Sequence, residues 1–276
     1  MDNIYGTKTI KIIKASGTYP DLKYYYEMAD KGHDIKTVYW TFDLGSVNCE
    51  NDIDLFEGGA SKYLHTKTIL DDIPYLYNKD ILLKKIPEWC LYEKQGKYTR
   101  GNAYSWGGEK SFSKDVALSN YTRGYVDLNQ IQLEDPAIYQ DKILNNIADL
   151  KCLVQSAGKT EFVFILPPYS MLWWDASYVN GILGERTLAL KAFMEEVLPL
   201  ENVKAYYFQA DRDVICNLDN YMDLVHYTPE INQMMLEAVV NGENEIQPGE
   251  YDQIEKNMME LIDTIETEEI PKYYEY

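Results

Sequence analysis

The feature that most constrains the fold is the alternation of strand-like and helix-like segments along the chain. The segment EFVFILP at 161–167 is short, apolar on both faces and closed by proline, which is typical of a strand inside a parallel sheet. A helical pattern precedes it, because Ile143, Ile147, Leu150 and Val154 recur at intervals of three or four residues. A helix followed by a strand buried on both faces predicts an α/β domain.

Three other segments have the short length and the β-branched or aromatic composition of strands. They are KTIKIIK at 8–14, TVYWTFD at 37–43 and VKAYYFQ at 203–209. Helical patterns separate or follow the strands at 20–32, 184–198, 229–240 and 251–266. Strand, helix and strand at this spacing form βαβ units, which require a parallel sheet. We therefore expect an α/β fold, a three-layer αβα sandwich with a mainly parallel sheet.

The middle and the end of the chain differ from this pattern. Residues 45–135 contain Gly-rich stretches and only short helical patches, such as 78–86, so we expect a long, mostly irregular insertion in a single domain at 1–241. The last 36 residues contain eleven acidic residues and two lysines. This balance predicts a solvated acidic helix and tail at 242–276, with an acidic docking site as the alternative.

Composition excludes several classes of partner. The net charge of −19 opposes binding to nucleic acid or to an anionic membrane, and no apolar run approaches the roughly 20 residues of a membrane span. The four cysteines are far apart and form no metal-binding cluster, so we expect neither a metal nor a cofactor, and buried thiols instead. The 25 tyrosines suit a sugar-lined cleft, but they suit ordinary half-buried positions equally well.

A carboxylate and an imidazole lie close together in the segment NYMDLVHYTPEIN at 220–232. Asp223 precedes His226 by three residues, just before a helix that Thr228 can cap and Pro229 can begin. At this spacing the carboxylate can fold back to hold the imidazole in one tautomer, with its second nitrogen acting as a general base. The alternative is a capping or structural pair. The other two histidines have no suggestive neighbours, so His226 is the favoured base.

Two serines are candidate hydroxyl groups in the loops that follow predicted strands. Ser16 lies in a strand-to-helix turn, where a nucleophile is often presented, although small residues are common in any such turn. Ser170 in PPYS is the second candidate, or else a turn residue beside packed aromatic rings. Tyr169 and Trp173 are candidates for a sugar-binding surface, with a core or lid role as the alternative.

The segments FILPPYSMLWWD, NVKAYYFQ and LDNYMDLVHYTPEIN, in this order, resemble the SGNH (GDSL-like) hydrolase superfamily. The chain is most similar to the bacterial branch associated with polysaccharide and cell-wall modification, over about 5–265. The resemblance implies a flavodoxin-like αβα fold and a Ser/His/Asp triad, with Asp223 as the acid, His226 as the base and Gly17 in the place of the oxyanion-hole glycine. It also implies esterase or O-acyltransferase chemistry on carbohydrate-linked acyl groups, in proteins that are membrane-anchored or extracytoplasmic.

Two departures from the family pattern lower the activity that we expect. The strand and turn that bear the family's nucleophile would lie before Met1, so the chain looks amino-terminally shortened. Asp43 stands where an amide donor is wanted, and a carboxylate repels a developing oxyanion. We therefore expect little hydrolase activity, and the esterase interpretation requires that His226 face the turn after 8–14. The alternatives are a non-catalytic carbohydrate-binding or scaffolding protein, or a gene fragment; oligomeric state and location stay open.

Overall fold

The computed structural model describes residues 9, 11–14, 17–50, 68, 70, 73, 77, 79–96 and 110–274. The chain forms two compact units. One comprises Met1–Gly17 and Ile53–Lys110, and the other comprises Thr18–Asp52 and Ser111–Tyr276. The second unit contains the sheet and also the segment at 242–276, which the sequence had suggested was a separate tail.

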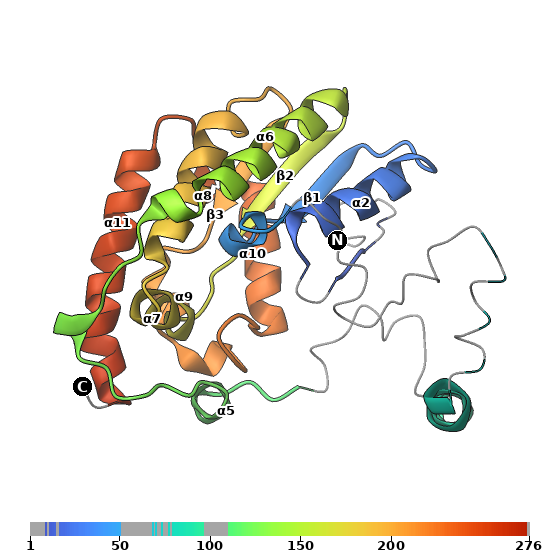
Figure 1. Ribbon diagram of the computed structural model, residues 1–276, viewed down its shortest axis with the longest axis horizontal. Helices are drawn as coiled ribbons and strands as arrows, with labels where there is room; N and C mark the ends of the chain where they lie inside the picture. The colour runs from blue at the N-terminus through green and yellow to red at the C-terminus, as the bar shows by residue number, and fades with distance from the viewer. Residues whose placement is uncertain are drawn as a thin grey trace. The chain divides into compact units, whose positions relative to one another are not determined.

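A four-stranded sheet forms the centre of the second unit (Figure 1). Its spatial order is β1 (Thr37–Thr41), β2 (Glu161–Leu166), β3 (Val203–Tyr207) and β4 (Glu245–Ile246). The first three strands are parallel, and β4 is antiparallel to β3. The predicted α/β class with a mostly parallel sheet is confirmed. The sequence carries no signal for β4, because two residues are too few to show a period of two.

Helices flank the sheet, and their bounds agree closely with the periodic segments of the sequence. The longer ones in this unit are α2 (Tyr19–Asp30), α6 (Gln140–Ser156), α8 (Leu183–Glu196), α10 (Pro229–Asn241) and α11 (Tyr251–Thr264). The shorter ones are α5 (Lys114–Ser119), α7 (Met171–Val179) and α9 (Arg212–Ile215). Single turns of 3-10 helix occur at Leu44–Val47, Leu128–Gln130, Pro136–Ile138, Leu218–Asn220 and Ile270–Lys272.

The strands bury alternate residues in two different cores. Phe162 and Phe164 of β2 pack with residues of α6 and α8, which lie side by side (Figure 1). Val163 and Ile165 pack with residues of α10. Because apolar groups cover both faces, β2 is apolar at successive positions, as its sequence predicted. Burial of a side chain of this size stabilises the fold by about 1.5–3 kcal/mol.

The predicted strand at 8–14 is not found in the described residues of that segment. Thr9 and residues 11–14 adopt no regular secondary structure, and Ile12 and Ile13 are exposed. Side chains of a strand alternate between faces, so the lysines at 8, 11 and 14 would place charge on both sides of a sheet whose central strands are apolar. The prediction was therefore wrong for the residues that the structure describes.

The acidic C-terminal segment packs on the second unit by an apolar stripe. Beyond α11 the chain continues as a π-helix at Ile265–Glu269. Met258, Ile262, Ile265 and Ile270 are buried with residues of α7. The expectation of a solvated helix and tail is wrong for this stripe and for Glu266 and Glu269, which are also buried, whereas Glu260, Asp263 and Glu268 are exposed.

In the other unit, the structure describes a π-helix at Ile81–Lys85 that continues as α4 (Ile86–Lys94). The sequence indicated a short helical patch at 78–86, and the helix extends to Lys94. Much of the expected insertion at 45–135 lies outside the described residues. Within the described part of the chain, no helix has both the length and the apolar character that a bilayer crossing requires.

Candidate functional site

Three loops follow the parallel strands at one edge of the sheet. Asp43 follows β1, Tyr169 and Ser170 follow β2, and the long loop after β3 carries Asp223 and His226. Because the carboxyl ends of parallel strands share an edge, these loops are neighbours, and this edge is where open α/β sheets place their sites.

Asp223 and His226 form the hydrogen-bonded pair that their spacing predicted. Nδ1 of His226 lies 2.7 Å from Oδ2 of Asp223. The other carboxylate oxygen, Oδ1, accepts the backbone N–H groups of Val225 at 2.9 Å and of His226 at 2.8 Å. Both oxygens of the carboxylate thus bind within its own loop. The side chain of His226 is half exposed, so its ring reaches the surface while its orientation is fixed.

The electrostatics of the pair determine which nitrogen can act as a base. Burial by itself raises the pKa of Asp223, but hydrogen bonds from the His226 ring and from the two backbone N–H groups outweigh burial and lower this pKa. Asp223 is therefore ionised at neutral pH and can only accept hydrogen bonds. Nδ1 of His226 must then donate, and in the neutral imidazole the lone pair is on Nε2.

The loop that carries the pair is closed on itself by backbone bonds. The N–H of Met222 donates to the carbonyl of His226 at 3.0 Å, and the N–H of Thr228 donates to the carbonyl of Asn220 at 2.9 Å. A strand-like bridge pairs Tyr221 with Tyr227. Thr228 takes the N-cap position of α10 with Pro229 at N1, but within the described residues its side chain makes no capping bond.

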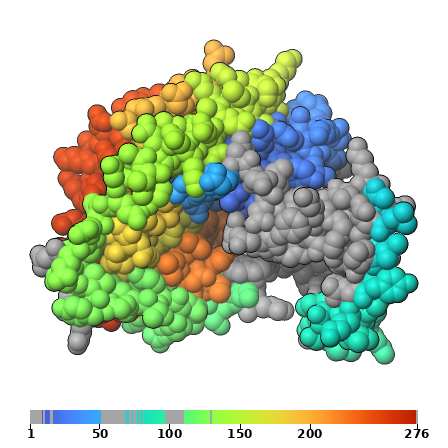
Figure 2. All heavy atoms as spheres, viewed as in Figure 1, coloured from blue at the N-terminus to red at the C-terminus, as the bar shows by residue number. Residues whose placement is uncertain are grey.

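Segments distant in sequence hold this loop from outside. The N–H of Ser113, at the start of α5, donates to the carbonyl of Tyr221, and Nδ2 of Asn120 donates to the carbonyl of Met222 at 2.8 Å. Figure 2 shows the orange region that follows β3 reaching the surface beside the green segment that contains α5. The loop is therefore a rigid platform, which a base of fixed orientation requires.

Both carboxylate oxygens of Asp43 accept hydrogen bonds from donors within the protein. Its Oδ2 accepts the hydroxyl of Tyr169 at 2.9 Å, and its Oδ1 accepts the N–H of Gly45 at 2.7 Å. Burial raises the pKa of Tyr169 well above its ordinary value, and the nearby charge of Asp43 adds to the effect, so Tyr169 stays a neutral donor. The carboxylate that we expected at a substrate or oxyanion position thus serves mainly to join two loops.

Trp173 and Arg186 form a stacked pair beside this bond. The guanidinium carbon of Arg186 lies 5.0 Å from the centroid of the Trp173 ring, and Nη1 donates to Oε1 of Glu185 at 2.7 Å. A Cβ atom on Gly45 would lie only 2.2 Å from that nitrogen, so glycine lets the guanidinium approach the loop after β1. Trp173 is 8% exposed, which leaves little ring area for a sugar.

Sequence reasoning missed Arg186 and Gln209. Arg186 lies near the start of α8, where a basic residue opposes the helix dipole, and this was the one signal from which a tertiary partner could have been inferred. Gln209 follows β3 and is fully buried, and neither polar atom of its amide has a hydrogen-bond partner among the described residues. A glutamine at the end of a strand gives no comparable signal.

The serine candidates have different outcomes. Ser170 is fully buried, and its hydroxyl donates to the carbonyl of Leu224 at 2.9 Å. Ser16 lies outside the described residues. The N–H of Gly17 donates to the carbonyl of Lys14 at 3.3 Å, and Gly17 belongs to the unit of Met1–Gly17 and Ile53–Lys110. The expected approach of His226 to the turn at Ser16 and Gly17 therefore stays a prediction.

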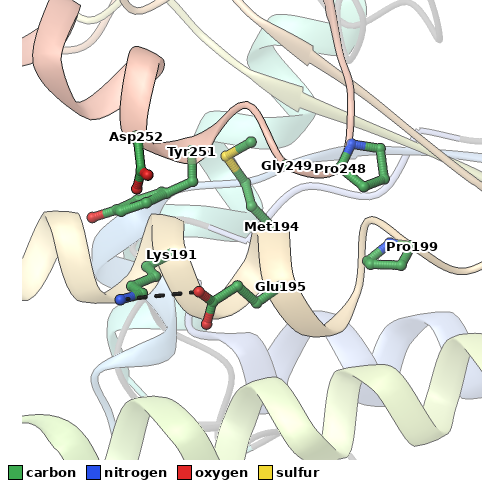
Figure 3. A pocket seen from close by; sticks show the side chains of 8 residues that line it. All are labelled: Lys191, Met194, Glu195, Pro199, Pro248, Gly249, Tyr251 and Asp252. Carbon is green, nitrogen blue, oxygen red and sulfur yellow. Dashed lines mark ion pairs between the residues drawn. The ribbon is translucent and has the colours of Figure 1, made fainter.

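A separate pocket of about 370 Å³ lies between α8 and the start of α11 (Figure 3). Three of its polar side chains, Lys191, Glu195 and Tyr251, are already paired. Nζ of Lys191 lies 3.9 Å from Oε1 of Glu195, and the hydroxyl of Tyr251 donates to Glu255 at 2.7 Å. Binding sites present a few convergent polar groups, so the carboxyl edge is the better candidate.

No protein-family model, curated protein or solved structure matches this chain. The candidate site is thus defined by its geometry. Within the described ranges, His, Cys, Asp and Glu side chains form no group of three that could hold a metal ion.

Proposed function

We propose that this protein is an SGNH-type serine esterase or O-acyltransferase, of low activity, acting on acyl groups of carbohydrates or cell-envelope polymers. The observation that carries the proposal is the 2.7 Å contact of His226 Nδ1 with Asp223 Oδ2, on a rigid loop at the carboxyl edge of a parallel sheet. This arrangement suits a general base whose imidazolium form is stabilised by a carboxylate.

In the proposed reaction, a hydroxyl oxygen attacks the carbonyl carbon of an ester, and Nε2 of His226 takes the hydroxyl proton. The tetrahedral intermediate collapses, and the leaving alkoxide receives that proton from His226. Water or a sugar hydroxyl then attacks the carbonyl carbon of the acyl group while Nε2 of His226 takes its proton. The serine oxygen leaves and receives that proton, which frees the enzyme and releases the acyl group. Ser16 is the proposed nucleophile, and backbone N–H groups near Gly17 are the proposed oxyanion donors. Asp43 stands in the sequence where the family has an amide donor, and a carboxylate cannot donate a hydrogen bond to a developing oxyanion, which is our reason for expecting a low rate.

We also propose that the fold belongs to the three-layer αβα class with flavodoxin-like topology. The packing of α6 and α8 on one face of β2, and of α10 on the other, supports this assignment. In the SGNH superfamily that the chain resembles, the Asp and His of the triad come from one segment near the carboxyl end, and Asp223 and His226 here follow β3, the last parallel strand.

Hydrolysis of an aryl acetate tests the proposed base. We expect slow turnover that falls at least tenfold in His226→Ala, because a positioned base contributes roughly 10²- to 10⁴-fold. His33→Ala is the matched control, since His33 is an exposed imidazole after α2 and free imidazoles hydrolyse such esters without a site. Equal losses in both variants, or none in His226→Ala, would contradict the proposal. A parallel loss in Ser16→Ala would identify the nucleophile.

A second candidate is a non-catalytic carbohydrate-binding protein with the same fold. The high tyrosine content and the occupied carboxylate of Asp43 favour it. Binding to a glycan array that persists in His226→Ala, together with no labelling by a fluorophosphonate probe, would support this candidate over the esterase.

A further inference from the structure

We infer that Ser170 is a positioning residue for the Asp223–His226 pair, which its hydroxyl orients through a single peptide group. The inference rests on the proposed function of that pair as acid and base.

Both polar groups of the peptide between Leu224 and Val225, its carbonyl oxygen and its N–H, make hydrogen bonds. Its carbonyl oxygen accepts two hydrogen bonds from Ser170, at 3.0 Å from the backbone N–H and at 2.9 Å from Oγ. Its N–H, which is that of Val225, donates to Oδ1 of Asp223 at 2.9 Å. In a trans peptide the C=O and N–H groups lie in one plane and point in opposite directions, so Ser170 and Asp223 bind opposite edges of this peptide.

These bonds form a continuous chain from Ser170 to His226. The Ser170 hydroxyl donates to the 224 carbonyl, the 225 N–H donates to Asp223, and the same carboxylate accepts from Nδ1 of His226. Hydrogen bonds in series polarise one another, so a donor on the carbonyl makes the N–H of that peptide a stronger donor. Ser170 therefore strengthens the bond that holds the Asp223 carboxylate in place.

Ser170, at which this series of hydrogen bonds begins, is held firmly by its surroundings. Ser170 is fully buried at the N-cap of α7, in the turn that follows β2. Next to it, the hydroxyl of Tyr221 donates to the carbonyl of Pro168 at 2.8 Å, which fastens the same two loops a second time. A buried hydroxyl already committed to a backbone carbonyl is suited to orient a neighbour, and it is poorly placed to attack a substrate.

Amide hydrogen exchange of Val225 tests this role without any substrate. Ser170→Ala removes the hydroxyl and keeps the backbone N–H bond, while Ser170→Thr keeps both. A hydrogen bond is worth about 0.5–1.5 kcal/mol, so exchange of the Val225 amide should accelerate roughly 2- to 12-fold in Ser170→Ala. It should return to the wild-type rate in Ser170→Thr. The amide of Phe164, in the central strand, reports any change in global stability.

Acceleration at Val225 beyond that at Phe164, with rescue by threonine, is the expected result. An unchanged ratio of the two rates in Ser170→Ala would overturn the inference. Loss of fluorophosphonate labelling in Ser170→Ala with an unchanged ratio would assign the serine as a nucleophile and also overturn it. If Ser170→Ala does not fold, Ser170→Cys replaces the hydroxyl with a thiol of similar volume, which is a weaker hydrogen-bond donor. The ratio of the Val225 and Phe164 exchange rates in this variant then tests the inference in the same way. Because exchange needs no turnover, an inactive protein would disprove the esterase and leave this result intact.

Discussion

The hydroxyl of Tyr169 donates a 2.9 Å hydrogen bond to Oδ2 of Asp43, and this bond joins the loops that follow β2 and β1. The neighbouring residue, Ser170, joins the same turn to the loop after β3. Two consecutive residues at the end of the central strand thus connect all three loops of the carboxyl edge. Their bonds add to the backbone bonds within the loop after β3 and to the contacts from α5 that hold that loop.

Tyr169→Phe should destabilise the protein by about 1.5–3 kcal/mol, because it removes a hydrogen bond to the charged, half-buried carboxylate of Asp43. Urea unfolding followed by fluorescence measures this change. Tyr125→Phe is the matched control, since Tyr125 is 78% exposed. Asp43→Asn combined with Tyr169→Phe should cost less than the sum of the two single changes. Additive losses would show that the two side chains do not interact.

The same tyrosine predicts a change of stability at alkaline pH. Burial and the charge of Asp43 raise the pKa of Tyr169 in the folded state. Its contribution is therefore fully present below the unfolded value of about 10, and it is lost as the pH rises from there toward the folded value. Between pH 9 and 11.5, the free energy of unfolding should fall more steeply in the wild type than in Tyr169→Phe. Parallel curves would contradict this account.

We expect the fold to depend strongly on the buried ion pair between Arg123 and Asp175, a residue of α7. Nε of Arg123 lies 2.9 Å from Oδ2 of Asp175, and both side chains are almost fully buried. Asp175→Ala leaves a buried guanidinium without this carboxylate and should cost about 3–5 kcal/mol in urea unfolding. Glu195→Ala, which removes the exposed partner of Lys191, should cost less than about 1 kcal/mol. Similar losses in the two variants would argue that the ion pair is not buried.

Gln209→Met should stabilise the protein. The buried amide of Gln209 has no hydrogen-bond partner in the described part of the chain, and an unsatisfied buried group costs about 1–3 kcal/mol. Methionine has a similar volume and removes that cost. Thermal unfolding should show a higher midpoint, whereas Gln253→Met on the exposed face of α11 should change little. A lower midpoint in Gln209→Met would mean that the amide is bonded in the folded protein.

The sequence was most informative where one physical signal dominated. Periodic Ile143, Ile147, Leu150 and Val154 are all buried in α6, and the apolar run at Glu161–Leu166 is the central strand β2. The Asp223–His226 contact followed from their spacing of three residues, because a loop of that length lets the carboxylate reach the imidazole.

Other features of the site depend on contacts between segments that are distant in the sequence, and a local sequence pattern cannot predict such contacts. The role of Ser170 depends on a carbonyl 54 residues away. The stacking of Arg186 on Trp173 depends on the packing of α8 against α7 and on the absence of a side chain at Gly45. The segment at 8–14 misled because its isoleucines resemble a strand, while its lysines would charge both faces of a sheet.

The most direct test of the central claim is the tautomer of His226, read from two-bond ¹H–¹⁵N correlations at a pH where the ring is neutral. Only three histidines contribute signals, and His226→Ala assigns the relevant one. The account predicts the Nδ1–H form, with the lone pair on Nε2, and its loss in Asp223→Asn. A neutral His226 with its proton on Nε2 would contradict the claim that Asp223 prepares this imidazole to act as a base.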